Sequence, residues 1–242
     1  MHESLKRIVG PRGEYRDPTR FQSYAFFDLD GTLISDVSVV AFLRFYLESE
    51  FPESAESRWV EFHTALSSMR YQGVARDKIN AWFYHRYFTG IEIELVRHHA
   101  ERWVEMRCRD TSFIKAEVFK ALQEHREMGT GNVLVTGSFR EIADPLAKRF
   151  GIDSYICAPL EEIDGRYTGR MTAAPTIGYG KWLAVDRFLT EHDVAPEDCL
   201  GYGDDHTDIP LLERLGQPFV IATGSAQLLA HANISGWNVL RA

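Results

Sequence analysis

The sequence predicts an α/β fold: a Rossmann-like, doubly wound parallel sheet with a helical segment inserted after its first strand. From Asn132 onward, short apolar runs alternate with segments of helical periodicity, as expected for a parallel sheet with helices on both faces. Between Ile34 and Glu127 the periodicity is helical, and half of the chain's aromatic residues lie there. This middle segment is therefore expected to be a helical insertion into the α/β core.

The composition is that of a globular protein with one large domain or two smaller ones, because its 242 residues are 45% hydrophobic and 26% charged. The formal net charge is -8 and no Lys/Arg-rich run occurs, so nucleic acid is not an expected partner. The three cysteines, Cys108, Cys157 and Cys199, are widely spaced, which argues against a disulfide framework or a zinc site and favours a reducing cytoplasm. Residues 1–20 are polar and contain Gly and Pro. We expect a flexible lead-in there and no membrane partner.

The expected elements follow the chain in a simple order. A strand at Tyr24–Phe27 precedes a helix from Val39 to Leu47, for which Ser35, Asp36 or Ser38 could supply the N-cap. An Asp-Gly turn within 161–170 predicts a small hairpin at the sheet edge. Further helices are expected around 55–70, 76–88, 91–107, 112–128, 139–150, 179–192, 208–215 and 225–232, and further strands at 133–135, 154–157, 199–202, 219–221 and 237–240.

Two acids stand one residue apart at the end of the first strand. The turn formers Gly31 and Thr32 should end the strand at Asp28 and Asp30, and the alternation of side chains then points both carboxylates the same way. Carboxyl ends of parallel strands face the ligand crevice. Because two like charges need a cation or a proton to relieve them, the pair predicts a divalent metal. The alternative is an Asx-type turn, since Asp-Gly is a common turn dipeptide.

Polar residues also follow the strand at 133–135. The hydroxyl and backbone amides of Thr136, Gly137 and Ser138 could bind a phosphoryl group at the start of the next helix. An ordinary strand-to-helix cap explains the same residues. Lys181 lies near the start of a later helix, where a cation is unfavourable with respect to the helix dipole, although a surface lysine is the default interpretation.

The strand at 199–202 is followed by Asp204, Asp205 and Asp208. Hard oxygen ligands at a strand end suit Mg²⁺, which binds one or two carboxylates together with substrate phosphate. His206 is expected to be a solvated loop residue, because an oxygen-rich setting disfavours zinc. The acids alone could equally belong to a helix N-terminus.

These four motifs, in this order, resemble those of the haloacid dehalogenase-like phosphohydrolases, whose first motif is a hydrophobic strand followed by Asp-x-Asp-Gly-Thr. The resemblance runs from about Ala25 to Leu240. The helical insertion and the run from Thr136 to Asp208 are most similar to the phosphoserine phosphatase branch, subfamily IB. The resemblance implies an α/β core over residues 21–35 and 126–242, with a helical cap over 36–125 that covers the site.

The resemblance also implies a role for each motif. Asp28 would be the nucleophile and Asp30 the general acid and base. Asp204 would bind Mg²⁺ together with the Asp28 carboxylate and the Asp30 main-chain carbonyl, and Asp208 would support this metal site. Lys181 would neutralise charge between the nucleophile and the phosphate.

Thr136 and the Gly137 amide would hold phosphoryl oxygens, with Ser138 beside them. The phosphoserine-specific enzymes carry a Glu nine residues after the nucleophile, where this chain has Val37. That departure argues against phosphoserine itself. The neighbouring Asp36 is either an N-cap or a substrate-binding residue.

The implied function is that of a Mg²⁺-dependent phosphatase of metabolic or biosynthetic role, which cleaves a small phosphorylated metabolite through an aspartyl-phosphate. A phosphotransferase would share every residue, and a phosphate-binding protein without catalysis is a third alternative. The acid at position 30 and the acid cluster at 204–208 argue against a dehalogenase, whose leaving halide needs neither a proton nor Mg²⁺.

Overall fold

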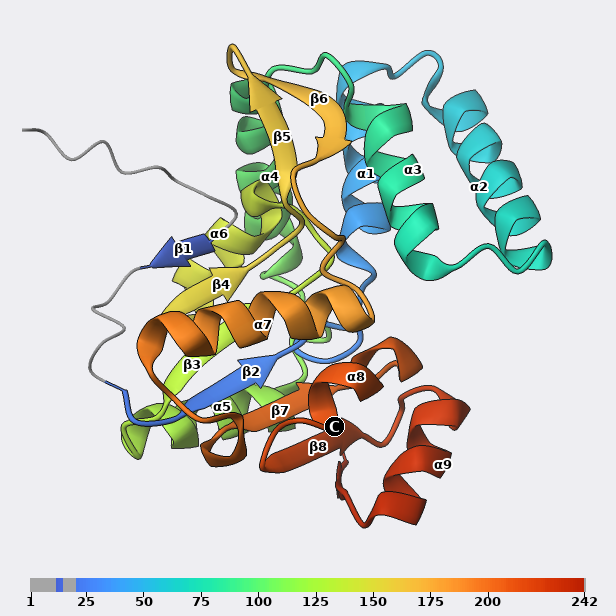
Figure 1. Ribbon diagram of the computed structural model, residues 1–242. Helices are drawn as coiled ribbons and strands as arrows, with labels where there is room; N and C mark the ends of the chain where they lie inside the picture. The colour runs from blue at the N-terminus through green and yellow to red at the C-terminus, as the bar shows by residue number, and fades with distance from the viewer. Residues whose placement is uncertain (1–11, 15–20, 242) are drawn as a thin grey trace, which may run out of the picture.

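The computed structural model describes residues 12–14 and 21–241. Within these residues, a seven-stranded sheet has the order β1-β4-β3-β2-β7-β8-β9, in which all neighbours are parallel except β1 and β4 (Figure 1). The lead-in expected over residues 1–20 contains β1, and the rest of it lies outside the described residues. The strands are β1 Arg12–Glu14, β2 Tyr24–Phe27, β3 Gly131–Val135, β4 Ser154–Ile156, β7 Leu200–Gly203, β8 Gln217–Ile221 and β9 Asn238–Leu240.

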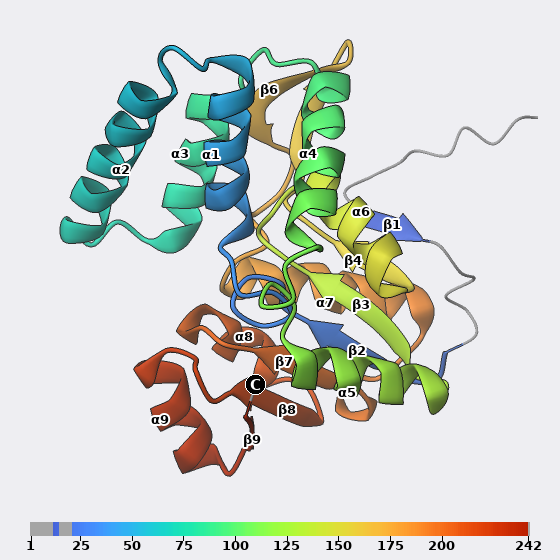
Figure 2. The ribbon, with the colours of Figure 1, turned by 180° about the vertical axis from the view of Figure 1, so that it is seen from behind.

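Helices cover both faces of this sheet, which confirms the doubly wound fold (Figure 2). Side chains alternate along β2, so Tyr24 packs edge-on against Phe188 of α7, whereas Phe27 lies against His125 of α5 on the other face. All four residues of β2 are buried, as expected for a strand covered on both sides. The core helices are α5 Ala116–Glu127, α6 Arg140–Phe150, α7 Tyr179–His192, α8 Ile209–Leu212 and α9 Ala226–Ser235, with short 3₁₀ turns η2 Pro196–Asp198 and η3 His206–Asp208.

The insertion after β2 forms a separate helical layer beyond the carboxyl ends of the strands (Figure 1). Its aromatic core includes Phe88, fully buried against Phe42 and Tyr84, and this core meets Phe139 at the start of α6. Aromatic packing thus joins the layer to the α/β core. The helices are α1 Ser38–Glu50, α2 Ala55–Tyr71, α3 Arg76–Phe88 and α4 Ile93–Arg107.

The hairpin of β5 Leu160–Ile163 and β6 Arg166–Met171 is not at the edge of the main sheet, where it was expected. It forms its own two-stranded sheet and packs against the helical layer. The Tyr167 amide donates to the Ile91 carbonyl, and the Gly90 amide donates to the Tyr167 carbonyl. These backbone hydrogen bonds to the α3–α4 connection hold the hairpin away from the main sheet.

Helix α5 packs against β3, and Asn132 Nδ2 donates to the Leu122 carbonyl at 3.0 Å. We therefore propose that the cap comprises α1 to α4 with the hairpin, and that its boundary lies before α5 rather than at residue 125. None of the helices within residues 21–241 is both long and apolar enough to cross a membrane.

Candidate active site

The carboxyl ends of β2, β3 and β7 meet at one edge of the sheet, beneath the helical layer. Phe27 of β2 is in register with Leu134 of β3 and with Tyr202 of β7. The polar residues that follow these strands are therefore brought to one place, as parallel neighbours require. This register explains why motifs far apart in the sequence lie together.

Three acids form a tight cluster there. One carboxylate oxygen from each of Asp28, Asp204 and Asp208 lies within 4.8 Å of the other two. Thr32 Oγ1 donates to Asp204 Oδ1 at 3.2 Å, and the amides of Asp204 and Asp205 both donate to Asp208 Oδ2 at 3.2 Å. The carboxylates are thus held in place by the loops that follow β2 and β7.

Lys181 is buried between two of these acids rather than exposed at the surface. Its Nζ donates to Asp28 Oδ1 at 2.7 Å and to Asp208 Oδ1 at 2.6 Å, and the residue is only 3% exposed. Burial alone would lower the pKa of Lys181, but Asp208 and Asp28 raise it above its ordinary value. The ammonium is therefore charged and neutralises part of the cluster.

The carboxylates that Lys181 does not neutralise repel one another, and the pKa values of two of them are raised. Burial raises the pKa of Asp28 well above its ordinary value; Lys181 opposes this, and the repulsion of Asp208 and Asp204 adds to it. Burial and the repulsion of Asp208 raise the pKa of Asp204 to about 6. Both shifts arise because like charges share a buried site, which is the condition that a bound cation relieves.

Asp30 lies beside this cluster, but its carboxylate faces the helical layer. The Ser38 amide, at the start of α1, donates to Asp30 Oδ1 at 2.9 Å. Burial raises the pKa of Asp30, although the hydrogen bonds from Ser38 and the charge of Arg76 lower it. Helix α1 begins after Val37 without a side-chain N-cap, so the N-cap expected from Ser35, Asp36 or Ser38 is wrong.

The loop after β3 forms another part of the floor. Gly137 lines the cavity, and its carbonyl accepts from Asn80 Nδ2 at 3.1 Å and from Tyr84 Oη at 2.9 Å. Thr136 is buried behind it, and its Oγ1 accepts from the Ser138 amide at 3.0 Å. The Ser138 hydroxyl is buried without a hydrogen-bond partner among the described residues. Two cap residues therefore hold the loop that carries the second motif.

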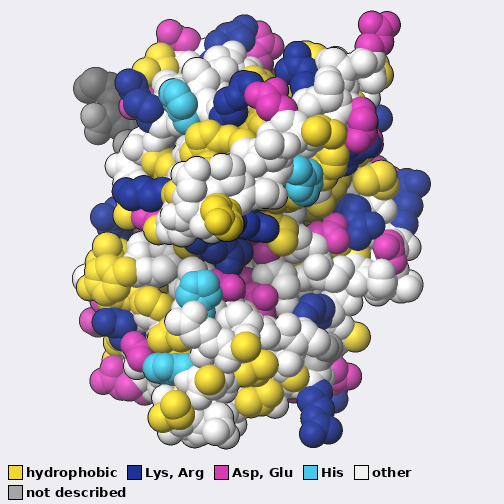
Figure 3. Space-filling view, turned by 90° about the vertical axis from the view of Figure 1, so that its right-hand side faces the viewer, with side chains coloured by type: hydrophobic (Ala, Val, Ile, Leu, Met, Phe, Trp, Pro, Cys, Tyr) yellow, Lys and Arg dark blue, Asp and Glu magenta, His cyan; other side chains and the backbone are white. Residues whose placement is uncertain are grey.

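A cavity of about 440 Å³ lies between this floor and the helical layer. Figure 3 shows charged side chains of both signs across the middle of the molecule, between the cap and the core. The wall of the cavity is mostly apolar on the cap side, and Val37 on this wall is 45% exposed. The apolar residues of the cap wall are Val37, Val39, Val40, Phe62, Leu66, Val74, Ala75, Ile79, Trp82 and Phe83.

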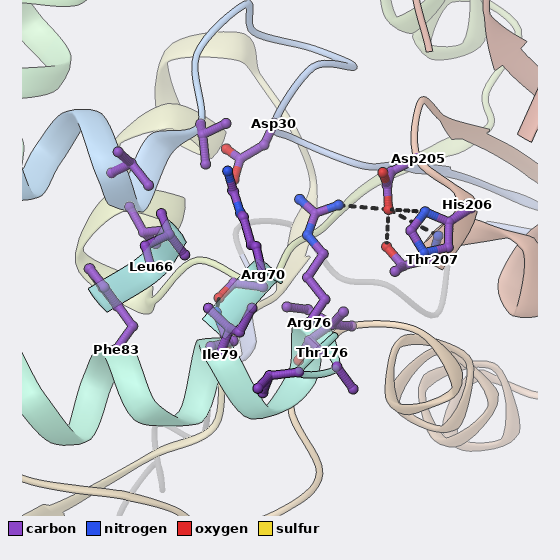
Figure 4. A pocket seen from close by; sticks show the side chains of 18 of the residues that line it. Asp30, Leu66, Arg70, Arg76, Ile79, Phe83, Thr176, Asp205, His206 and Thr207 are labelled. Atoms are coloured by element: carbon purple, nitrogen blue, oxygen red, sulfur yellow. Dashed lines mark hydrogen bonds and ion pairs between the residues drawn. The ribbon is translucent and has the colours of Figure 1, made fainter. Parts of the chain in front are cut away.

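Two arginines of the cap also line the cavity, and the sequence patterns did not single them out (Figure 4). Arg76 Nη1 lies 2.6 Å from Asp205 Oδ1, and His206 Nδ1 lies 3.3 Å from the same oxygen. Arg70 is exposed. The only sequence signal for Arg70 and Arg76 is their place on either side of a glycine-containing connection between helices.

Asp36 does not line this cavity. Its carboxylate accepts from Arg107 Nε at 2.8 Å and from Arg107 Nη2 at 3.1 Å. Asp36 is therefore not the N-cap of α1, and an arginine of α4 pairs with both of its oxygens outside the cavity lining.

The known proteins that this chain resembles include hydrolases and phosphatases. The sequence model of the haloacid dehalogenase-like hydrolases matches residues 25–213. A probable phosphatase of Mycobacterium tuberculosis is 28% identical over 226 residues, which cover 91% of this chain and 76% of that protein. A histidinol-phosphatase of Neisseria meningitidis is 28% identical over 229 residues, which cover 90% of this chain and 98% of that protein. A solved structure of a phospho-aspartyl intermediate analogue of phosphoserine phosphatase has the same fold, with a TM-score of 0.61 and 14% sequence identity. The match covers 91% of this chain and 92% of that chain.

The close approach of Gly31 to Asp204 gives a first prediction. Gly31 has φ +78°, and a Cβ there would lie 2.2 Å from Asp204 Oδ2. Gly129 is a matched control, because its φ is +79° and no atom lies within 4 Å of its added Cβ. Each Ala substitution should lower the free energy of unfolding by about 1 to 3 kcal/mol.

Only Gly31→Ala should also displace the Asp204 carboxylate, and it should weaken the Mg²⁺ binding that the sequence leads us to expect at the acidic cluster by about tenfold or more. Urea unfolding and calorimetric Mg²⁺ titration of both variants test this. Equal Mg²⁺ affinities in the two variants would contradict the proposed reason for a glycine at position 31.

Proposed function

Because the chain belongs to the haloacid dehalogenase-like hydrolase family, we propose that it is a Mg²⁺-dependent phosphatase that cleaves a small phosphate monoester through an aspartyl-phosphate on Asp28. One observation carries the proposal. Asp28 lines the cavity floor with its carboxylate 2.7 Å from the Lys181 ammonium and beside Asp204 and Asp208. A carboxylate in this position is oriented to act as a nucleophile toward a phosphate in the cavity.

The donor set fits Mg²⁺, since all clustered donors are carboxylate oxygens and the raised pKa values of Asp28 and Asp204 mark unrelieved negative charge. Asp28, Asp204 and the main-chain carbonyl of Asp30 would hold the ion, with Asp208 supporting them through its contacts with Lys181 and the loop amides. The ion would supply Lewis-acid stabilisation of charge on the phosphoryl oxygens.

Lys181 would reduce the repulsion between the Asp28 carboxylate and the phosphate dianion. Two like charges at reduced dielectric repel by several kcal/mol, and a buried ammonium hydrogen-bonded to the nucleophile offsets part of this. The loop at Thr136, Gly137 and Ser138 would hold phosphoryl oxygens through the Thr136 hydroxyl and the Gly137 amide. The hydrogen bonds from Asn80 and Tyr84 to the Gly137 carbonyl support this role, because they fix the orientation of the loop.

Asp30 would donate a proton to the departing alkoxide and then take one from the water that hydrolyses the aspartyl-phosphate. An ordinary Asp is ionised at neutral pH, so this acid role requires a raised pKa. Burial supplies a shift in that direction at Asp30. Because the Ser38 amide of the cap donates to the same carboxylate, closure of the cap also helps to set its position.

Two other functions would use the same floor. A phosphotransferase would pass the phosphoryl group from Asp28 to an acceptor hydroxyl instead of water, and a phosphate-binding protein would lack turnover. Asp28, Asp30 and Lys181 line the same cavity, and this combination favours catalysis over binding alone.

A reducing cytoplasm remains the proposed setting. The proposed partner is a small phosphorylated metabolite and not nucleic acid.

Our second prediction tests the nucleophile. Asp28→Asn should abolish phosphate release, by about a thousandfold or more, because an amide cannot form the acyl-phosphate. The fold should persist, since Asn has nearly the same shape as Asp and Asp208 still pairs with the Lys181 ammonium. Phosphate release from a panel of monoesters, measured with and without Mg²⁺ on protein checked by circular dichroism, provides the test. Turnover close to that of the wild type would exclude this role for Asp28.

The substrate proposal rests on the cap side of the cavity. Val37, where the phosphoserine-specific enzymes have a Glu, is exposed to the cavity, and the neighbouring cap wall is apolar. Of the relatives, the histidinol-phosphatase is named for a substrate whose organic part is larger than serine. We therefore propose a phosphate monoester with an uncharged or partly apolar organic part, large enough to use a cavity of about 440 Å³.

The third prediction follows from this wall. A partly apolar ester should exceed phosphoserine in kcat/KM by about tenfold or more, because it buries apolar surface against the cap. Trp82→Ala should change this ranking more than it changes Mg²⁺ affinity. Trp59→Ala is the matched control, since Trp59 is a partly buried cap tryptophan outside the cavity lining. A clear preference for phosphoserine would overturn the inference from Val37 but not the proposed chemistry.

A further inference from the structure

We propose that Arg76 is a further catalytic residue, a cation carried by the cap that contacts the phosphoryl group, and that Asp205 is the residue that positions it. The inference rests on the phosphatase function proposed above. It assigns a task to two side chains that have no role in the chemistry proposed above: Arg76 on the cap, and Asp205, which belongs to the fourth motif on the core.

Arg76 is placed at the junction between the cap and the floor of the cavity. It is the first residue of α3 and lines the same cavity as Asp28 and Asp30. Figure 4 shows its side chain extending from the cap helix to Asp205 on the core loop, where Nη1 lies 2.6 Å from Oδ1. Asp205 directly follows Asp204, a member of the acidic cluster. The ion pair therefore brings a cap guanidinium to the edge of the floor on which the phosphate would lie.

The acids that line the cavity outnumber the Lys and Arg side chains that line it. Among the described residues, the acids that line the cavity are Asp28, Asp30, Asp204, Asp205 and Asp208, and the Lys and Arg side chains that line it are Lys181, Arg70 and Arg76. Burial would lower the pKa of Arg76, but its attraction to Asp205, Asp28 and Asp208 raises it, so the guanidinium is charged and its field reaches the nucleophile. A phosphate dianion adds negative charge to this acidic floor, and a planar guanidinium matches its oxygens.

Asp205 is itself held in place by hydrogen bonds within the core loop. Its Oδ1 accepts from the Thr207 amide at 3.0 Å and from Thr207 Oγ1 at 2.8 Å. The carboxylate is therefore fixed by the core loop, independently of the cap. When the cap lies over the core, this fixed carboxylate orients the guanidinium of Arg76. Although the Arg76 side chain is 45% exposed, its guanidinium is therefore held against a carboxylate that the core loop fixes.

A simple latch between cap and core is the competing explanation, and the chain offers a matched control for it. Arg86 lies on the same helix as Arg76 and forms an ion pair of the same length, 2.6 Å, with Glu61. Both partners of that pair belong to the cap and neither lines the cavity. Arg86→Gln therefore removes a comparable ion pair without removing charge from the site.

The test measures kcat and KM for a small and a large ester, ethyl phosphate and phenyl phosphate, and inhibition by inorganic phosphate, which has no leaving group. Arg76→Gln should lower kcat/KM about a hundredfold for both esters. It should also weaken inhibition by phosphate about tenfold or more. Arg76→Lys should recover part of each loss, and Arg86→Gln should behave as the wild type. Asp205→Asn should lower kcat/KM clearly less than Arg76→Gln does, because the guanidinium of Arg76 remains present.

Equal losses in Asp205→Asn and Arg76→Gln would overturn the proposal in favour of a latch, since either change breaks the ion pair. A loss confined to phenyl phosphate, with unchanged inhibition by inorganic phosphate, would overturn it in favour of a contact with the leaving group. If the wild type hydrolyses neither ester and binds no phosphate, the proposed function fails and this inference falls with it. Wild-type turnover with an unaffected Arg76→Gln variant overturns this inference alone.

Discussion

The buried ammonium of Lys181 between Asp28 and Asp208 is the interaction on which the site depends. Removing one partner from a buried ion pair costs about 3 to 5 kcal/mol, because the other charge is left without compensation. The three side chains come from α7, from the end of β2 and from the turn after β7, so only the assembled parallel sheet brings them together. The acids that Lys181 leaves uncompensated account for the raised pKa values of Asp28 and Asp204, and for our proposal of a divalent cation.

The cap is joined to this floor by polar contacts at the residues that would carry the chemistry. Ser38 donates to Asp30, Asn80 and Tyr84 donate to the Gly137 carbonyl, and Arg76 pairs with Asp205. Movement of the cap would break these contacts together. If the proposed function holds, admission of substrate would be coupled to the arrangement of the groups that act on it, which is a task expected of a lid over a water-sensitive reaction.

Most of the sheet and of the floor could be predicted from the sequence, because every strand except β1 contains an apolar run and Asp28, Thr136 and Asp204 each directly follow a strand. Contacts that depend on how separate layers dock could not. The N-terminal amide of α1 donates to Asp30 instead of to an N-cap side chain next to it in the sequence. The hairpin at 160–171 forms backbone hydrogen bonds with the α3–α4 connection, and Asp36 pairs with Arg107 of α4. No local pattern places Arg76 against Asp205, since these residues lie on different layers and far apart in the chain.

The most direct test of the account is chemical trapping of the intermediate during turnover. The enzyme is quenched while it hydrolyses a good ester in the presence of Mg²⁺, then reduced with borohydride, which converts an acyl-phosphate of Asp to homoserine, and its peptides are sequenced by mass spectrometry. The account predicts homoserine at position 28, with Asp30 and Asp204 unchanged. Homoserine at another acid, or none anywhere while phosphate is being released, would contradict it.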